Sequence, residues 1–209
     1  MPAERLHLVR HGEVHNPGRV LYGRLPGFGL SADGRRMARQ AAEYVRAQER
    51  PMSTLVVSPL QRTRESAEPF EELFGIDPYI DDRVIEPTNV FEGRRMQRVF
   101  YNPLNWRHLS QPSLPSWGEP YLQVVERMRA AMDDAWDRVD GGDVVVVSHQ
   151  LPIWITHLAM AELPLRHDPR RRRCALSSVT SFERRDGRWY EIAYAEPAST
   201  ADAVDVGAV

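Results

Sequence analysis

Three short runs of apolar, mostly β-branched residues constrain the fold of this 209-residue chain more than any other feature. They are Leu6 to Val9, Thr54 to Val57, and Asp143 to Val147 with its four consecutive valines. Their apolar character is continuous rather than alternating, which is typical of strands buried on both faces of a largely parallel sheet. We therefore expect a central sheet whose two faces are both covered.

Helical patterns lie between these predicted strands. Residues 33–48 and residues 119–139 each carry apolar side chains at helical spacing. Near the C-terminus, residues 178–184 and 189–195 flank an Arg-Asp-Gly turn at 185–187, which predicts a β-hairpin. The expected fold class is α/β: a three-layer sandwich with a largely parallel central sheet, an antiparallel edge strand, and helices on both faces.

The chain length favours one domain, which we expect to span residues 1–195. Residues 88–118 form a candidate lid or cap, because residues 102–118 are rich in proline and hold two tryptophans. A loop pinned by its own tryptophan packing is an equal alternative for this segment. Residues 196–209 are small, polar and acidic, and we expect a flexible C-terminal tail.

Every basic residue apart from histidine is arginine, because the sequence contains no lysine. This excludes P-loop nucleotide-binding enzymes, protein kinases and Schiff-base enzymes, which need a lysine. The net charge of -2 argues against nucleic acid or an anionic membrane surface as a partner. No apolar run reaches the roughly 18 residues of a membrane span, and the first residues lack a signal-peptide pattern, so we expect a cytoplasmic protein. The single cysteine, Cys174, excludes an internal disulfide.

Charged and imidazole side chains follow all three predicted strands. The first strand runs into Arg10-His11-Gly12-Glu13, the second into Ser58-Pro59-Leu60-Gln61-Arg62, and the third into Ser148-His149-Gln150. In open α/β sheets, ligands bind at the carboxyl ends of the strands. We therefore expect two histidines and two arginines on one rim of the sheet.

Helix starts are predicted at two of these strand ends. Ser58 and Gln61 have the spacing of a capping box around Pro59, and Pro152 marks a second start that leaves free N–H groups near Gln150. Arg62 falls in the first turn of this helix, where the helix dipole disfavours a cation. An anion bound at the same helix N-terminus would make the position favourable for Arg62. Arginines and imidazoles at helix N-termini describe a pocket for a dianion, most simply a phosphoryl group. Since lysine, a metal-ligand cluster and a Ser-centred elbow are missing from the sequence, the available nucleophile is a histidine, which would form a phosphohistidine.

A metal site is the alternative use of the histidines, because His7, His11 and His15 are spaced by four. On a helix this spacing would align three zinc ligands. However, His7 lies inside a strand pattern, and Gly12 and Pro17 are incompatible with a helix. We therefore expect no metal and no cofactor.

Four motifs together resemble the histidine phosphatase superfamily, whose fold is also called phosphoglycerate-mutase-like. They are "LVRHGEVHN", "VVSPLQRTRESA", an Ile-Glu pair shortly before "FEG", and "VVVVSHQLPIW", and the resemblance covers about residues 5–195. It implies that His11 becomes phosphorylated and that Arg10, Arg62 and His149 hold the phosphoryl oxygens. A nearby backbone carbonyl, such as that of Gly12, would fix the tautomer of His11.

The resemblance also implies an acid and further substrate contacts. Glu86 is the expected acid that protonates the leaving alcohol, with Glu13 and Glu92 as alternatives. Asn16 is an expected phosphate contact, and Gln150 adds an amide where the family commonly has glycine.

The function implied is that of a metal-independent phosphoric monoester hydrolase of the histidine acid phosphatase type, acting on a small organic phosphate ester. The alternatives are a cofactor-dependent phosphoglycerate mutase and a non-catalytic phospho-ligand sensor or scaffold. The sequence leaves a homodimer open. Candidates for the outer pocket are Tyr22, Arg24, Arg94, Arg95, Trp106 and Trp117. We expect the run from Arg170 to Arg173 to be a solvated loop.

Overall fold

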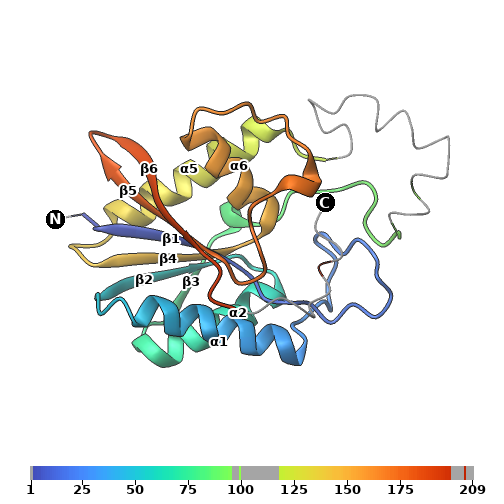
Figure 1. Ribbon diagram of the computed structural model, residues 1–209, viewed down its shortest axis with the longest axis horizontal. Helices are drawn as coiled ribbons and strands as arrows, with labels where there is room; N and C mark the ends of the chain where they lie inside the picture. The colour runs from blue at the N-terminus through green and yellow to red at the C-terminus, as the bar shows by residue number, and fades with distance from the viewer. Residues whose placement is uncertain (1, 96–98, 100–117, 199–204, 206–209) are drawn as a thin grey trace.

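The computed structural model describes residues 2–95, 99, 118–198 and 205, and its described part contains a six-stranded sheet flanked by helices (Figure 1). The strands are β1 (Arg5–Arg10), β2 (Met52–Val57), β3 (Pro78–Ile80), β4 (Asp143–Ser148), β5 (Val179–Arg185) and β6 (Arg188–Ala195). The helices are α1 (Ala32–Arg46), α2 (Gln61–Phe74), α5 (Tyr121–Asp137) and α6 (Gln150–Met160), with 3₁₀ turns at Asp82–Val84 and Pro169–Arg171. All three strands and both helices predicted above are present.

The sheet is mostly parallel, with strand order β3-β2-β4-β1-β5-β6. Strands β3, β2, β4 and β1 pair in parallel, whereas β5 is antiparallel to both of its neighbours, β1 and β6. The predicted parallel sheet with an antiparallel edge is therefore confirmed.

Helices cover both faces of the sheet, because successive residues of a strand point to opposite sides. Leu6, Leu8 and Val146 pack with α5 and α6 on one face. Val9 and Val147 pack with α1 and α2 on the other. Figure 1 shows the resulting three layers, with α5 and α6 above the sheet and α1 and α2 below it.

The hairpin between β5 and β6 turns at Asp186 and Gly187, whose φ angles are 51° and 74°. Two successive positive φ angles are typical of a type I′ turn, the connection that best matches the twist of two antiparallel strands. This confirms the hairpin predicted from the Asp-Gly pair.

The predicted capping box at the start of α2 is wrong. The helix begins at Gln61 behind Leu60, which makes no side-chain cap. The Ser58 hydroxyl instead accepts a hydrogen bond from His149, which directly follows β4. A tertiary partner has therefore replaced the local one, although Arg62 still lies in the first turn of the helix.

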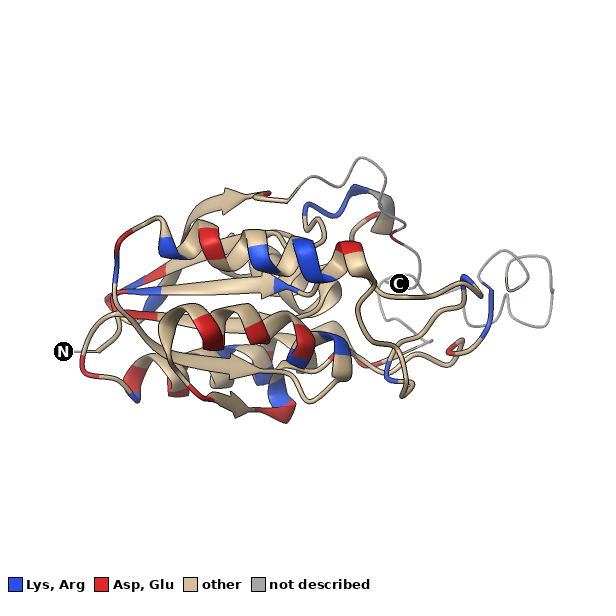
Figure 2. Cartoon of the chain, turned by 90° about the horizontal axis from the view of Figure 1, so that it is seen from below, with Lys and Arg blue, Asp and Glu red and all other residues tan. Residues whose placement is uncertain are grey.

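Acidic and basic residues are interspersed on the outer face of α1, whereas α2 has its arginines at the start and glutamates beyond them (Figure 2). Ion pairs such as Arg36–Asp33 and Arg39–Glu43 lie along α1. None of the helices in the described part of the chain combines the length and apolar character that crossing a membrane requires.

Of the predicted lid, residues 88–118, the structure describes residues 88–95, 99 and 118, and the proline-rich part of the prediction lies outside the described residues. Of the predicted C-terminal tail it describes Glu196 to Ala198 and Asp205. Ala198 is buried against Met37 and Leu176, and Asp205 reaches the site described next.

Candidate active site

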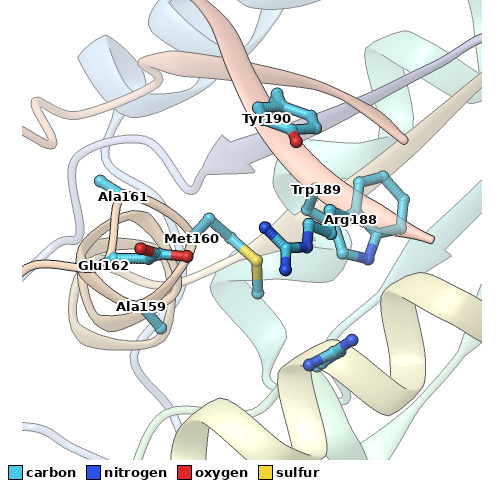
Figure 3. A pocket seen from close by; sticks show the side chains of 8 residues that line it. Ala159, Met160, Ala161, Glu162, Arg188, Trp189 and Tyr190 are labelled. Atoms are coloured by element: carbon cyan, nitrogen blue, oxygen red, sulfur yellow. The ribbon is translucent and has the colours of Figure 1, made fainter. Parts of the chain in front are cut away.

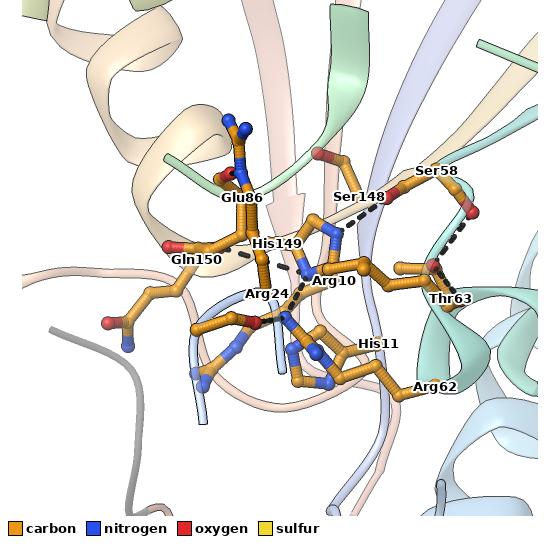
Figure 4. A network of polar contacts seen from close by, with 12 residues as sticks. Arg10, His11, Arg24, Ser58, Arg62, Thr63, Glu86, Ser148, His149 and Gln150 are labelled. Atoms are coloured by element: carbon orange, nitrogen blue, oxygen red, sulfur yellow. Dashed lines mark hydrogen bonds and ion pairs between the residues drawn. The ribbon is translucent and has the colours of Figure 1, made fainter. Parts of the chain in front are cut away.

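The carboxyl ends of β1, β2 and β4 meet on one rim of the sheet. Arg10 pairs with Ser148 and Val57 pairs with Val147, so the residues that follow these strands emerge side by side. Figure 4 shows the polar network formed there by the three predicted strand ends. The predicted convergence of the histidines and arginines is observed.

His11 is buried, and its tautomer is fixed by its neighbour. Its Nδ1 lies 2.8 Å from the carbonyl oxygen of Gly12. Because a carbonyl only accepts, Nδ1 carries the proton, which leaves a lone pair on Nε2. Burial, assisted by the charges of Arg62 and Arg10, lowers the pKa of His11 well below its ordinary value. The imidazole is therefore neutral and nucleophilic at Nε2.

The loop that carries His11 packs directly on the start of α1. A Cβ atom on Gly12 would lie 2.3 Å from the carbonyl oxygen of Gly34 in α1. This clash would be with backbone, so no side-chain movement could relieve it. The Gly12 N–H also donates to Ser66 Oγ in α2 at 3.1 Å. Glycine at position 12 therefore allows the backbone approach that positions the His11 loop.

Arg62 and His149 form a buried pair. Arg62 Nη2 donates to the Gly23 carbonyl at 2.9 Å and lies 3.1 Å from His149 Nδ1. Since Arg62 can only donate, Nδ1 of His149 accepts and Nε2 donates to Ser58 Oγ at 2.7 Å. Burial, with the charge of Arg62, lowers the pKa of His149. A neutral His149 thus orients Arg62, whose guanidinium also stacks on the Tyr22 ring at 4.7 Å. The contact of His149 with a phosphoryl oxygen remains a prediction.

Glu86 lies beside this pair. Its Oε2 is 3.8 Å from His149 Nδ1, and the residue is 7% exposed. Burial raises its pKa even though Arg62 and Arg172 oppose the shift. Glu86 therefore has the environment of a carboxylic acid that holds its proton more tightly than a solvated one.

The two alternative acids have other partners. Glu13 accepts from the Ser31 hydroxyl at 2.5 Å, at the start of α1. Glu92 accepts from the backbone N–H of Arg24 at 3.0 Å. Of the three carboxylates, Glu86 is the one that the structure places against His149.

Arg10 is fully buried and meets an acidic residue from the end of the chain. Its Nη1 donates to the Cys174 carbonyl at 2.6 Å, while Nη1 and Nη2 donate to the two carboxylate oxygens of Asp205 at 2.8 and 2.6 Å. Burial opposes the charge of Arg10, but the Asp205 carboxylate outweighs it and raises the pKa of Arg10. An anion thus already occupies the fork of Arg10.

Two buried side-chain donors lie at this rim. The Nε atoms of Arg10 and Arg62 are enclosed and have no hydrogen-bond partner among the described residues. An unsatisfied buried N–H costs about 1–3 kcal/mol, so its persistence needs an explanation. An anion bound between the two guanidinium groups would provide one.

Asn16 and Gln150, the two other predicted substrate contacts, have hydrogen-bond partners outside the buried pair. The side-chain amide of Asn16 exchanges two hydrogen bonds with the backbone of Val20, at 2.8 and 3.2 Å. Gln150 begins α6 and accepts from Arg172 at 3.3 Å. Within the described residues, neither side chain hydrogen-bonds to Arg62 or His149.

Sequence reasoning missed Ser58, Ser66 and Asp205 as partners of the site. Ser58 and Ser66 stand in the motif that contains Arg62, yet the spacing of Ser58 indicates only a helix start and nothing in the sequence assigns a role to Ser66. Asp205 carried no signal, because nothing near it in the sequence points to Arg10.

A hollow of about 470 Å³ lies elsewhere, between the C-terminal end of α6 and the start of β6 (Figure 3). Met160, Arg188 and Trp189 are among its lining residues. Because α6 begins next to His149 and runs away from that rim, this hollow lies at the opposite edge of the sheet from His11. Within residues 2–95, 99, 118–198 and 205, no group of three His, Cys, Asp or Glu side chains is suited to a metal ion.

Comparisons with known proteins identify close relatives. The chain is 45% identical to the uncharacterized protein Rv0525 of Mycobacterium tuberculosis over 203 residues, which cover 95% of this chain and 100% of that protein. It is 29% identical to the probable phosphoglycerate mutase GpmB of Escherichia fergusonii, covering 88% of this chain and 87% of that one.

A solved structure agrees with the fold. The mycobacterial glucosyl-3-phosphoglycerate phosphatase Rv2419c is 26% identical and superposes with a TM-score of 0.73, covering 90% of this chain and 96% of that chain. The model of the histidine phosphatase superfamily (branch 1) matches residues 6–196. With the fold and the motifs already described, this match shows that the chain belongs to the histidine phosphatase superfamily.

Proposed function

We propose that the protein is a metal-independent phosphomonoesterase that hydrolyses a small organic phosphate ester through a phosphohistidine on His11. The observation that carries this proposal is the pair of buried, unpartnered Nε–H donors of Arg10 and Arg62, whose charges both act on His11. Guanidinium donors match the oxygens of a phosphoryl group in geometry and in charge.

The proposed reaction has two displacements. His11 Nε2 attacks phosphorus, so that an N–P bond forms while the bond from phosphorus to the ester oxygen breaks, and Glu86 gives its proton to the leaving alcohol. The Glu86 carboxylate then takes a proton from water, whose oxygen attacks phosphorus and releases inorganic phosphate and neutral His11. Arg10 and Arg62 stabilise the charge on the phosphoryl oxygens in both steps.

The protonation states that this reaction needs are favoured by burial. Attack requires a neutral His11 and a protonated Glu86, whereas ordinary histidine and glutamate pKa values, near 6.5 and 4.3, allow this pair only as a minor species. Burial moves both groups in the required directions, because it lowers the pKa of His11 and raises that of Glu86. This supports an enzyme of the acid phosphatase type.

A phosphoglycerate mutase is the second candidate, favoured by the resemblance to the GpmB protein. It would use the same nucleophile but return the phosphoryl group from His11 to a phosphoglycerate instead of to water. The two functions differ in the fate of the phosphoenzyme, which an assay can follow.

The test is phosphate release from para-nitrophenyl phosphate and a panel of small phosphomonoesters in EDTA, with wild type beside His11→Ala. We expect turnover that resists EDTA and disappears in the variant. If folded wild type releases no phosphate from any ester, the phosphatase proposal fails. Conversion of phosphoglycerates with a bisphosphate primer would then indicate a mutase, and binding without conversion a sensor or scaffold.

A further inference from the structure

A further arginine beside the site, Arg172, hydrogen-bonds to neutral side chains within the described part of the chain. Arg172 follows the 3₁₀ turn Pro169–Arg171, and its side chain is partly buried rather than solvated, so the predicted solvated loop is wrong at this position. Its Nη1 donates to Gln150 Oε1 at 3.3 Å and its Nε donates to His167 Nε2 at 2.9 Å. The ring of Tyr121 lies 5.6 Å from that of His167, and the charge of Arg172 acts on the Tyr121 hydroxyl.

The histidine in this cluster is neutral. Its Nδ1 lies 2.8 Å from the carbonyl oxygen of Leu165 and therefore carries the proton, so that Nε2 accepts from Arg172. Burial lowers the pKa of His167, which keeps the ring uncharged. Hence His167 fixes the position of the Arg172 guanidinium without balancing its charge.

No carboxylate in the described part of the chain forms an ion pair with Arg172. The nearby arginines differ in this respect, since Arg127 and Arg24 both pair with Glu119, at 2.8 and 3.6 Å. Burial lowers the pKa of Arg172, and the carboxylate that acts on it is Glu86. A partly desolvated cation without its own counter-ion is a favourable place for an anionic ligand.

Arg172 lies near the residues that we expect to face the leaving group of the ester. Gln150, which Arg172 contacts, directly follows His149, and His149 Nδ1 is 3.8 Å from Glu86. Glu86 is the proposed acid and therefore faces the departing oxygen of the ester. Arg172 thus lies on the side of the pocket that the alcohol part of the substrate would occupy.

We propose that Arg172, with Gln150 and Tyr121, forms a second anion subsite, and that the preferred substrates are phosphomonoesters whose alcohol part carries a further anionic group such as a carboxylate. The inference rests on the proposed function and specifies its substrate class. It assigns Arg172 the role of a specificity-determining residue.

Substrate binding at this subsite also helps the acid. The charges that act on Glu86 come from Arg62 on α2, Arg172 on the loop after α6, Arg10 at the end of β1, and Arg127 on α5. A substrate anion paired with Arg172 would cancel one of the charges that favour ionised Glu86. The proton would then remain on Glu86 to a higher pH in the complex with an anionic ester.

The test compares two esters that differ in one group, glycerol 3-phosphate and 3-phosphoglycerate, with wild type, Arg172→Gln, Arg172→Lys and Arg171→Gln. Arg171 is exposed, so Arg171→Gln removes the same charge from the neighbouring position. We expect wild type to favour the carboxylate ester in kcat/KM. Arg172→Gln should reduce that preference about 10- to 100-fold, mainly through KM, as expected for a lost charged hydrogen bond. Arg172→Lys should retain part of the preference and Arg171→Gln all of it.

Equal losses of kcat/KM for both esters in Arg172→Gln would overturn the subsite and would show that Arg172 has a structural role. An unchanged preference between the two esters would overturn it as well. Thermal melting of each variant checks folding. Calorimetric binding of the two esters to His11→Ala, with and without Arg172→Gln, measures the subsite without turnover. A selective loss of 3-phosphoglycerate binding there supports the subsite even if hydrolysis fails, so the two proposals are separable.

Discussion

Two buried charged side chains, one at each end of the sheet, differ in whether a group of opposite charge lies beside them. At the amino end, the carboxylate of Asp143 is 2% exposed and is enclosed by opposite charge and hydrogen-bond donors: Arg50 Nε at 2.8 Å and His7 Nε2 at 3.4 Å. At the carboxyl end, the guanidinium of Arg62 is as deeply buried, yet its hydrogen bonds go to a carbonyl and a neutral imidazole.

The pKa shifts of the two buried groups, Asp143 and Arg62, reflect this difference. Burial raises the pKa of Asp143, but hydrogen bonds from His7 and Arg50 outweigh it and leave that pKa below its ordinary value. At Arg62, burial is the dominant effect and lowers the pKa. A compensated charge holds the fold together, whereas an uncompensated one keeps free energy available for an anionic ligand.

The largest effect is expected at the carboxyl end, from His11→Ala. Loss of the proposed nucleophile should lower kcat at least about 10⁴-fold, by analogy with other catalytic nucleophiles. The fold should persist, because the hydrogen bond of the His11 ring among the described residues goes to the carbonyl of adjacent Gly12. Phosphate release and thermal melting of the same preparation check both parts, and substantial residual turnover would exclude His11 as nucleophile.

Glu86→Gln should lower kcat about 10²- to 10⁴-fold for alkyl phosphates, the usual range for a general acid or base. The loss should be much smaller for the first displacement of para-nitrophenyl phosphate, whose leaving group needs no proton. In wild type, alkyl ester turnover should fall as pH rises through the raised pKa of Glu86. A pre-steady-state burst of nitrophenol isolates the first step, and equal losses for both leaving groups would contradict the acid role.

Asp143→Ala tests the compensated end. Removing this carboxylate leaves Arg50 and His7 without their common partner and should lower the free energy of unfolding by about 3 kcal/mol. Because the folded pKa of Asp143 is lowered, its contribution is present above the unfolded value near 3.9 and disappears as pH falls through the folded pKa. Denaturant titrations should therefore show wild type and variant converging at low pH. Activity per folded molecule should be unchanged.

The smallest effect is expected from Asp205, whose carboxylate pairs with Arg10, one of the two arginines proposed to bind the phosphoryl group. Asp205 occupies the fork of Arg10, which a phosphoryl group would also use. Asp205→Asn should make inorganic phosphate about tenfold tighter as a competitive inhibitor, since a charged hydrogen-bonded pair no longer competes. Glu196→Gln is a matched control, because Glu196 contacts Tyr194 instead. Weaker inhibition in Asp205→Asn would show that Asp205 supports phosphate binding.

Local patterns were enough to predict the parallel strands, α1, α5 and the Asp-Gly hairpin, because each depends on the hydrophobic period or turn chemistry of a few successive residues. The Gly12 carbonyl as partner of His11 was predictable for the same reason, since the two residues are adjacent.

Other features depend on contacts between distant residues. Ser58 hydrogen-bonds to His149, 91 positions away, so the capping box expected from its spacing does not form. Arg172 stands in a run of four arginines that looks solvated, because sequence shows charge but not burial. Asp205 reaches Arg10 across 195 positions. Each would have required knowledge of the tertiary packing.

The contact between Gly12 and Gly34 makes α1 a mechanical support of the proposed catalytic site. A Cβ atom on Gly34 would lie 2.0 Å from the Glu13 carbonyl oxygen, a clash of backbone against side chain that no rotamer change can remove. One added methyl group would therefore displace the loop that holds His11, and a misplacement of about 1 Å can cost 10²-fold in rate. In a mutational scan scored by activity, Gly34 should behave like a catalytic position although it sits in a helix and touches no substrate.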